Sequence, residues 1–311
     1  MNWKGKSAII TGGAGFIGSH LADVLVENGA DVTIVDLMSK VGKANIEQLE
    51  GRANFMDVDV SDWQALERMD AGADYVFHLA AIAAPTHCEK YQDLAFKTNV
   101  QGMFNVLKFC VRKGVKKVLF PSSALLYGKN PKYLPIDEKH PIEVSNSVYN
   151  ITKRIGETML ADFHERDGLP FVLFRLFNAF GPRQTTDYFI PTVIDQAMKT
   201  KQIEVWSEKP TRDFTYVLDT VDAFVKAASS DFVGGPINIG SGREVRTGDI
   251  AKQIAKSLGA EIKSLNKDVT GSMRLQCDNR KAGEVLGWKP RVPFEDGLEK
   301  TIAWFKANQR M

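Results

Sequence analysis

Thr11-Gly12-Gly13-Ala14-Gly15-Phe16-Ile17-Gly18 is the stretch that decides the fold of this chain, and it directly follows the apolar run 8–10. The next residues, 19–26, carry apolar side chains at helical spacing, so the stretch joins a strand to a helix. A glycine-rich turn in that place leaves backbone N–H groups free at the positive end of the helix, which suits a pyrophosphate. Glycine also occurs in ordinary turns, so the residues that follow the motif decide whether it is a phosphate-binding turn.

A second strand-like run comes after the predicted helix, at 31–35, and it ends at Asp36 about 20 residues after the glycines. An acidic side chain there accepts a hydrogen bond from a ribose 2′-OH and repels a 2′-phosphate, which favours NAD over NADP. Lys40 and Lys43 lie nearby and weaken this preference. The alternative is a glycine turn followed by a surface aspartate. The order strand, glycines, helix, strand and acid favours the dinucleotide site.

The composition is that of a folded protein with a core, since 44% of the 311 residues are apolar and 25% are charged. The 40 basic and 38 acidic residues give a net charge of +2, which offers no argument for nucleic acid or an anionic membrane as a partner. No apolar run approaches the ~20 residues that span a bilayer, and glycines interrupt the first one, so we expect neither a membrane span nor a signal peptide. Three cysteines without metal-ligand spacing predict reduced thiols in a cytoplasmic protein. The five histidines show no metal pattern either, and we expect no metal site.

Strand-like runs alternate with helical patterns through the first half of the chain. The expected strands are 7–10, 31–35, 53–56, 75–79, 117–120 and 171–175, and the expected helices are 16–28, 61–69, 94–113 and 148–166. This alternation predicts an α/β fold with a doubly wound parallel (Rossmann) sheet that carries helices on both faces. Ligands of such sheets lie outside the carboxyl ends of the strands.

After Arg175 the pattern becomes irregular, and prolines break the chain into shorter elements. These are Pro182, Pro191, Pro210, Pro236, Pro290 and Pro293. We therefore expect an NAD-binding domain at 1–178 and a smaller C-terminal substrate-binding lobe at 179–311, with a cleft between them. Some segments of the second part are expected to return to the first domain.

Tyr149 and Lys153 stand four residues apart in a predicted helix, so they share one face of it. A free phenol has a pKa near ~10 and is a poor base at neutral pH, but a neighbouring ammonium lowers that pKa. The pair is therefore a candidate proton acceptor that also returns the proton. Most pairs with this spacing lie on protein surfaces, and this one gains weight from Ser122 and Ser123, which follow a predicted strand. The alternative for the two serines is ordinary turn chemistry.

With these residues the chain resembles the extended short-chain dehydrogenases/reductases, and among them the NAD-dependent nucleotide-sugar epimerases and dehydratases. The resemblance covers nearly the whole chain, and its motifs are specific for the family rather than for one member. The matching residues are 11–18, Asp36, Asp59-Val60, His78-Leu79-Ala80-Ala81, Asn99, Ser122-Ser123-Ala124, Tyr127-Gly128, Tyr149 with Lys153, Arg175-Leu176-Phe177-Asn178, Gly181-Pro182-Arg183, Arg212-Asp213-Phe214 and Asn238-Ile239-Gly240.

The resemblance implies a cofactor site made by residues from several strand ends. It implies that the pyrophosphate is held by the glycine turn, through Gly12, Gly15, Phe16, Ile17 and Gly18, and that Asp36 binds the adenosine ribose. It further implies that the adenine is bordered by Asp59 and Val60, and that the wall along the cofactor consists of Leu79, Ala80, Ala81 and Ser122. Asn99 is expected to support the site.

The resemblance also implies the roles of the reacting residues. Tyr149 is expected to be the acid and base, Lys153 to hold the nicotinamide ribose, and Ser123 to polarise the reacting sugar oxygen. Asn178 and Arg212 are expected to hold the nucleotide diphosphate, because the planar fork of arginine pairs with phosphate oxygens. The alternative for Arg212 is a surface ion pair with the aspartate beside it in the sequence.

Three departures from the family pattern bear on the reaction and the substrate. Relatives that eliminate water or carboxylate carry a glutamate just after the active-site hydroxyl, where this chain has Ala124 and Leu125. A carboxylate is the natural base for C5 deprotonation, so its absence argues against a 4,6-dehydratase and against a decarboxylase, unless a distant loop supplies Glu143, Asp187 or Glu208. The segment 268–271 replaces a phosphate-binding Arg-Pro-Gly, so Arg274 becomes a candidate substrate-binding substitute, and 206–210 replaces a small glycine-rich turn.

We therefore expect epimerisation at C4 of a nucleotide-diphosphate sugar, with a UDP sugar favoured and NAD tightly held. Tyr149 takes the O4 proton while C4 is oxidised, and it returns the proton after the 4-keto sugar has rotated. The alternatives are an NAD-dependent nucleotide-sugar reductase or dehydrogenase, a 4,6-dehydratase, and a dinucleotide-sensing protein without catalysis. The resemblance further implies a homodimer through the helices at 94–113 and 148–166.

Overall fold

A parallel sheet forms the centre of the computed structural model, which describes residues 3–143, 147–267 and 271–308. Within these residues, seven strands run parallel in a single sheet. Their order is β10 (Gly234–Ile239), β6 (Phe171–Leu176), β5 (Lys117–Ser123), β4 (Tyr75–His78), β1 (Ser7–Thr11), β2 (Asp31–Asp36) and β3 (Asn54–Asp57). The order reverses direction next to β1, as in other doubly wound sheets.

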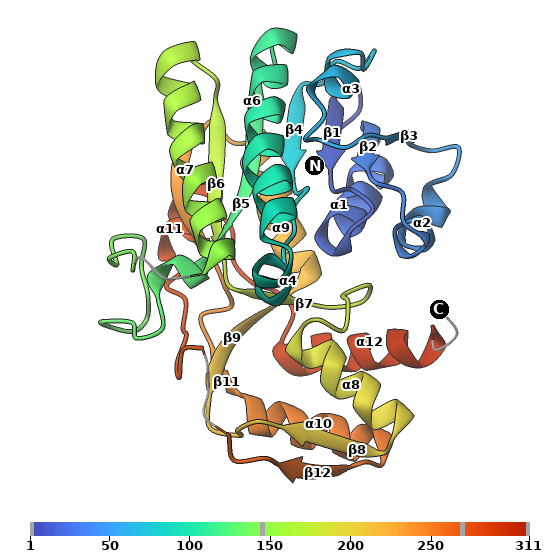
Figure 1. Cartoon of the computed structure of the whole chain (residues 1–311), viewed down its shortest axis with the longest axis vertical. Helices are drawn as coiled ribbons and strands as arrows, with labels where there is room; N and C mark the ends of the chain where they lie inside the picture. Colours follow the sequence, from blue (N-terminus) through green and yellow to red (C-terminus); the bar gives the residue numbers. More distant parts are fainter. Residues whose placement is uncertain (1–2, 144–146, 268–270, 309–311) are drawn as a thin grey trace.

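Helices cover both faces of this sheet, as Figure 1 shows. One face carries α1 (Phe16–Glu27), α2 (Lys40–Ile46), α9 (Val217–Ser229) and α11 (Arg280–Leu286), and the other carries α3 (Trp63–Glu67), α6 (Gly102–Lys113) and α7 (Val148–Asp167). Successive strand side chains alternate between the two cores: Ile10 and Ile34 pack on the first face, Ile9 and Val35 on the second. The predicted α/β fold with a doubly wound sheet is confirmed.

The predicted helix at 94–113 is interrupted. It consists of α5 (Gln92–Phe96), a π-helical turn η2 (Lys97–Gln101) and α6, and α4 (Pro85–Lys90) precedes it. A π-helical turn inserts an extra residue into a helix and is common at functional sites. Here it contains the buried Asn99, one of the predicted site residues.

Strand β10 returns from the second half of the chain to the edge of the sheet, beside β6. Its sequence contains Pro236, which donates no hydrogen bond, and the pairing shifts register between Gly234 and Ile237. Proline is tolerated there because β10 is an edge strand with an irregular ladder. Helix α9, directly before it, packs on α1.

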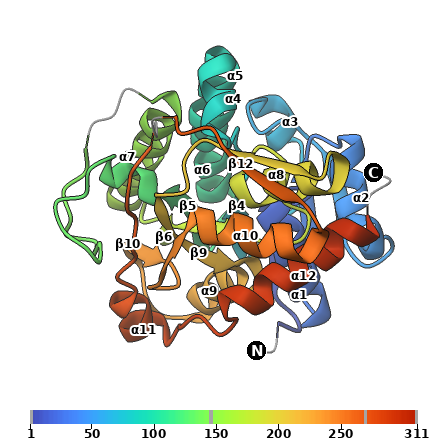
Figure 2. The same cartoon turned by 90° about the horizontal axis from the view of Figure 1, so that it is seen from below.

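The second lobe lies below the sheet in Figure 1, and in Figure 2 it lies in front of the strands. Its core joins α8 (Phe189–Lys199), α10 (Thr247–Leu258) and α12 (Phe294–Ala307) to the parallel pair β8 (Gln202–Val205) and β12 (Glu261–Ser264). Strands β11 (Glu244–Arg246), β9 (Thr211–Tyr216) and β7 (Asn178–Phe180) form a small sheet. Short 3-10 turns occur at η1 (Glu47–Leu49) and η3 (Ala124–Tyr127).

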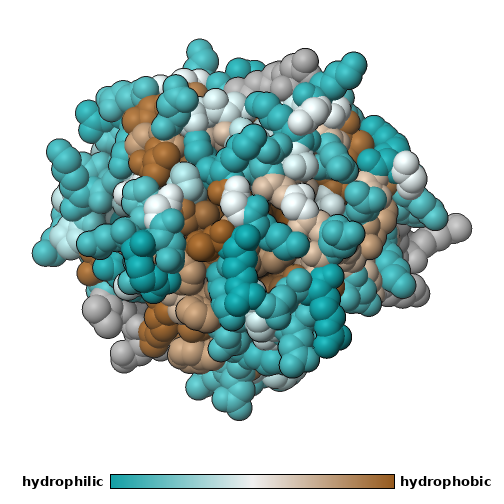
Figure 3. Space-filling view, turned by 90° about the horizontal axis from the view of Figure 1, so that it is seen from above, coloured by the Kyte–Doolittle hydropathy of each residue, from teal (hydrophilic) through white to brown (hydrophobic). Residues whose placement is uncertain are grey.

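The surface seen from above in Figure 3 is hydrophilic with separate apolar patches. None of the described helices is both long and apolar enough to cross a membrane. Cys88, Cys110 and Cys277 are buried free thiols. Across 3–143, 147–267 and 271–308, no cluster of His, Cys, Asp and Glu has an arrangement suited to a metal ion.

Candidate active site

A cavity of about 1090 Å³ lies at the carboxyl ends of the sheet strands, between the sheet and the second lobe. Residues at or after the ends of β1, β2, β4, β5 and β6 line one side, and residues of α8, β8 and β9 line the other. Parallel sheets bind their ligands in this place. The volume exceeds that of an ordinary small-molecule pocket, so the cavity has space for a dinucleotide and a second ligand.

The glycine turn forms one end of the cavity. Gly12 has a φ of +69°, and a Cβ at this residue would lie 2.6 Å from the backbone nitrogen of Ala80. A Cβ on Gly18 would overlap the carbonyl oxygen of Gly12, so helix α1 packs this closely only with glycine there. Gly15 precedes α1 without a side-chain cap, which leaves the first N–H groups of the helix available to an anion.

Asp36 ends β2 beside this turn and lines the cavity. Its Oδ2 accepts a hydrogen bond from the backbone N–H of Ala14 at 2.9 Å. Burial raises the pKa of Asp36, and the hydrogen bonds from backbone amides oppose this shift. The wall continues from the glycine turn with Phe16, Ile17, Asp59, Val60, Leu79, Ala80 and Ala81.

The structure brings the three predicted catalytic side chains together at the carboxyl end of β5. Tyr149 and Lys153 lie on the first turns of α7, and Ser123 is the last residue of β5. The Nζ of Lys153 donates to the carbonyl oxygen of Pro121 at 2.7 Å and lies 5.9 Å from the centroid of the Tyr149 ring. All three residues line the cavity, as does the neighbouring Ser122.

Burial governs the charges of this group. It raises the pKa of Tyr149 to about 12, and a hydrogen bond with Ser123 offsets only part of the shift. It lowers the pKa of Lys153 to about 8. The sequence predicts a lowered pKa for Tyr149, and this prediction is wrong. The desolvation of a buried phenol outweighs an ammonium that is engaged with Pro121.

Asn99 does not line the cavity but connects two parts of its wall. Its Oδ1 accepts from the N–H of Ile82 at 2.8 Å, and its Nδ2 donates to the Ile82 carbonyl at 3.1 Å and to the hydroxyl of Thr152 at 3.0 Å. Thr152 lies between Tyr149 and Lys153 on α7. Asn99 therefore ties this helix to the segment after β4.

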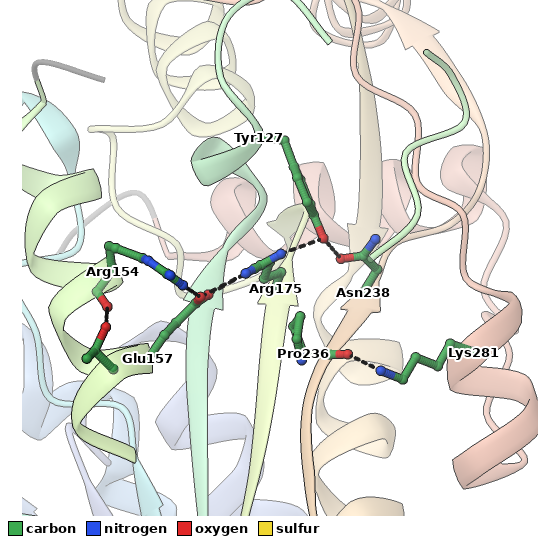
Figure 4. A network of polar contacts seen from close by, with 8 residues as sticks. Tyr127, Arg154, Glu157, Arg175, Pro236, Asn238 and Lys281 are labelled. Carbon is green, nitrogen blue, oxygen red and sulfur yellow. Dashed lines mark hydrogen bonds and ion pairs between the residues drawn. The ribbon is translucent and has the colours of Figure 1, made fainter. Parts of the chain in front are cut away.

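A buried ion pair fixes the same helix one turn further on. Arg175 of β6 donates to Glu157 of α7 through Nε (2.9 Å) and Nη2 (2.8 Å), and through Nη1 to the hydroxyl of Tyr127 (3.2 Å). Figure 4 shows that this chain of contacts continues from Tyr127 to Asn238. The sequence pattern includes Arg175 among the matching motifs but does not indicate its partner.

Arg212 on β9 is a half-buried cation on the wall of the second lobe. Its Nη1 donates to the carbonyl oxygen of Thr211 at 2.8 Å, and burial lowers its pKa. The alternative partner Asp213 instead accepts hydrogen bonds from Ser241, Gly242 and Cys277. Arg212 thus forms no ion pair with a described residue, and its charge is available to a ligand.

The other predicted substrate residues differ in position. Asn178 lines the cavity and donates to the Asp213 carbonyl at 3.0 Å. Arg274 lies outside the cavity wall, where its Nε donates to Glu244 at 3.0 Å. Residues 268–270, most of the segment that replaces Arg-Pro-Gly, lie outside the described residues, while Gly271 lines the cavity.

The three carboxylates suggested as distant bases differ in whether they line the cavity. Glu143 accepts from the N–H of Lys129 at 3.0 Å, and Glu208 pairs with Lys252 at 3.3 Å; neither lines the cavity. Asp187 lines it.

A model of the NAD dependent epimerase/dehydratase family matches residues 8–240, which include the glycine turn, β5, α7 and Arg212. The chain belongs to this family. The predicted cofactor, NAD, is confirmed at the level of the family, and the residues fit it. The uncapped start of α1, the close approach at Gly12 and the acid at the end of β2 are what a pyrophosphate and an adenosine ribose require.

Known members of the epimerase/dehydratase family resemble the chain along its whole length. UDP-glucuronic acid decarboxylase 1 of Xenopus tropicalis is 35% identical over 97% of this chain and 72% of the relative. A putative UDP-glucose 4-epimerase of Methanocaldococcus jannaschii is 32% identical over 97% of this chain and 99% of the relative. The solved UDP-glucose 4-epimerase of Thermotoga maritima, with UDP-glucose, has a TM-score of 0.90 and 31% identity, covering 98% of this chain and 100% of that one.

These likenesses establish an NAD-dependent family of nucleotide-sugar epimerases, decarboxylases and dehydratases. They do not distinguish the reactions, because a decarboxylase and an epimerase are similar to the chain to nearly the same degree.

The structure also adds cavity residues to which sequence reasoning gives no role. Tyr188 and Phe189 come after the matching motif 181–183, and Trp206 and Leu275 come from the second half of the chain. Their sequence positions are the one available signal. Trp206 lies in the segment 206–210, which departs from the family pattern, and Tyr188 is next to the candidate base Asp187.

Proposed function

We propose that this protein interconverts C4 epimers of a nucleotide-diphosphate sugar, with a UDP sugar as the favoured substrate. When bound, NAD supplies reversible oxidation at the sugar carbon. The chain's own residues bind the nucleotide, orient the sugar and move one proton.

Tyr149 takes the proton from O4 and later returns it, and Ser123 holds the same oxygen by a hydrogen bond. Lys153 favours the charged form of the phenol, because an ammonium near a phenolate lowers its energy. At the second lobe, Arg212 and Asn178 bind the diphosphate. This leaves the sugar held mainly at one end, so that it can turn in a cavity of about 1090 Å³.

The observation that carries the proposal is the apolar wall after Ser123. Ala124 and Leu125 line the cavity there, where a carboxylate would be needed to remove a proton from C5. Of the other carboxylates that line the cavity, Asp36 and Asp59 lie at the glycine-turn end and Glu204 lies on β8 of the second lobe. Asp187, in the loop before α8, is engaged with His87 and Thr185. The site supports oxidation and reduction at C4 but offers no base at the end of β5 for elimination.

The relatives named UDP-glucose 4-epimerase support the same reaction and the uridine nucleotide. The test is to incubate the purified protein with UDP-glucose, UDP-galactose and their N-acetyl counterparts, and to monitor products by NMR and mass spectrometry. Epimers of unchanged mass, formed without net NADH, are expected. A product lighter by one water or one carbon dioxide would contradict the proposal.

We also propose that two copies associate through α5, α6 and α7. Large apolar side chains are exposed on these helices: Leu94, Phe96, Phe104, Val111 and Ile151. Helices α6 and α7 pack against each other and lie side by side in Figure 1. A second copy would bury this surface, as apolar helix faces do in stable dimers.

A further inference from the structure

The cavity wall has few positive charges. Among its described residues only Lys153 and Arg212 are cations. Lys153 is engaged with Pro121 and serves Tyr149, so Arg212 alone is available for the diphosphate. The segments 144–146 and 268–270 contain no lysine or arginine. A sugar that brings a further negative charge therefore finds no cation to pair with.

A carboxylate stands instead at the end where the sugar reacts. Asp187 precedes α8 and lines the cavity next to Tyr188. Its contacts place it at this end, because Asp187 pairs with His87 of α4, and α4 packs on α7, the helix that carries Tyr149. C6 of a hexose is separated from C4 by a single carbon. A substituent at C6 therefore meets whatever lines this end of the cavity.

The Asp187 side chain is held in a defined place. Its Oδ1 lies 3.2 Å from Nε2 of His87, and its Oδ2 accepts from the hydroxyl of Thr185 at 3.0 Å. His87 belongs to α4, which is attached to the start of α7 by Glu89, whose Oε1 accepts from the N–H of Val148 at 2.8 Å. The carboxylate is thus fixed against the element that carries Tyr149.

We infer that Asp187 restricts this protein to nucleotide-linked sugars that are neutral at C6, and that it excludes sugars with a C6 carboxylate. The inference rests on the proposed function, because it assumes that the sugar is bound with C4 at Tyr149. The physical reason is repulsion between like charges at the cavity wall, where the Asp187 side chain is 35% exposed.

The pairing with His87 does not remove this discrimination. The contact engages His87 with the carboxylate, so it supplies no free positive charge to a uronate. A hydroxymethyl group at C6 is instead a hydrogen-bond donor for the carboxylate.

The first experiment measures binding to the NAD-loaded protein by calorimetry, with UDP-glucose and UDP-glucuronate as probes. The unmodified protein is expected to bind UDP-glucuronate at least about 10-fold more weakly. Asp187→Asn keeps the shape of the side chain and removes its charge. It should reduce the ratio of the UDP-glucuronate Kd to the UDP-glucose Kd about 10-fold, while the affinity for UDP-glucose stays within about 3-fold of that of the unmodified protein. Asp187→Lys supplies the missing cation and should strengthen UDP-glucuronate binding further. Asp195→Asn removes one charge on α8 outside the cavity and should leave the ratio unchanged.

The second experiment compares turnover of UDP-galactose and UDP-galacturonate by NMR in the same proteins. Equal binding and turnover of neutral and acidic sugars by the unmodified protein would overturn the inference and leave the proposed function intact. An unchanged ratio in both Asp187 variants would also overturn it. A binding preference without epimerisation of any neutral sugar would instead contradict the proposed function, because calorimetry does not depend on the reaction.

Discussion

Glu157 and Arg175 form a buried ion pair with two hydrogen bonds, which joins helix α7 to strand β6 one turn beyond Lys153. Burial acts to raise the pKa of Glu157, but the hydrogen bonds and charge of Arg175 reverse this and hold the pKa below its usual range. The pair therefore fixes the helix that carries the candidate acid and base against the strand next to β5.

We predict that Glu157→Gln lowers the free energy of unfolding by about 3 kcal/mol, because it leaves the buried guanidinium of Arg175 without a counter-charge. Urea unfolding measures this. Arg154→Gln is the matched control: Arg154 is the exposed partner of the same carboxylate, and its loss should cost less than about 1 kcal/mol. Equal decreases in the free energy of unfolding of the two variants would show that the buried pair contributes no more to stability than the exposed one.

We predict that Tyr149→Phe retains NAD and lowers kcat by ~10²–10⁴, the usual range for a lost acid or base. The control is Tyr188→Phe, which removes the hydroxyl of another tyrosine that lines the cavity. Its kcat should stay within about 10-fold of the unmodified protein, since it loses no proton transfer. Near-normal turnover of Tyr149→Phe would remove this residue from the proposed mechanism.

Lys153 gives a prediction for pH. Its pKa is about 8, below the ordinary value of 10.5, so between these pH values the unfolded chain binds more protons than the folded one. Stability therefore rises with pH across this window, and below it the buried ammonium costs about 3 kcal/mol. Lys153→Met should be more stable than the unmodified protein at pH 7, with a low kcat, and the gain should vanish near pH 10.5. Urea unfolding of the NAD-free unmodified protein and the Lys153→Met variant at a series of pH values tests this. A stability difference between the two that grows as the pH rises would contradict the prediction.

The proposed dimer predicts the effect of a charge on α6. Phe104 is 42% exposed and packs edge-on against Phe163 of α7. Phe104→Glu should convert a dimer into monomers in analytical ultracentrifugation, because a carboxylate would be desolvated in the interface. Phe55→Glu makes the same change at an exposed phenylalanine of β3, away from these helices, and should leave the mass unchanged. A monomeric unmodified protein would contradict the proposal at once.

The first half of the fold is predictable because its signals are local. Strand β1, the glycine turn and helix α1 lie within the first 27 residues, and the later alternation repeats the same unit. Strand β10 is not predictable in this way, since Pro236 and two glycines are typical of a turn. Only its pairing with β6 makes it a strand, and that pairing joins residues about 60 positions apart.

The site is predictable in its residues but not in its electrostatics. Ser123, Tyr149 and Lys153 stand at positions that a helical period and a strand end place together. The pKa of Tyr149 depends on burial by segments far along the chain, which no local spacing reveals. The contact between His87 and Asp187 joins a short helix of the first lobe to a loop before α8, so it emerges only in the folded molecule.

The last prediction concerns the choice between NAD and NADP. Asp36 lines the cavity at the end of β2, and its Oδ2 accepts from the Ala14 N–H in the glycine turn, so its charge lies beside the expected ribose. Asp36→Ala should weaken the binding of NAD by about 10-fold, because a charged hydrogen bond to the ribose is lost. It should also reduce the preference for NAD over NADP, because the repulsion between the carboxylate and a 2′-phosphate disappears. Asp57→Ala removes the carboxylate at the end of the next strand, in register with Asp36 but outside the cavity wall, and should leave both affinities unchanged. Fluorescence titration of each protein with each dinucleotide measures this, and equal or tighter binding of NADP by the unmodified protein would contradict the role of Asp36.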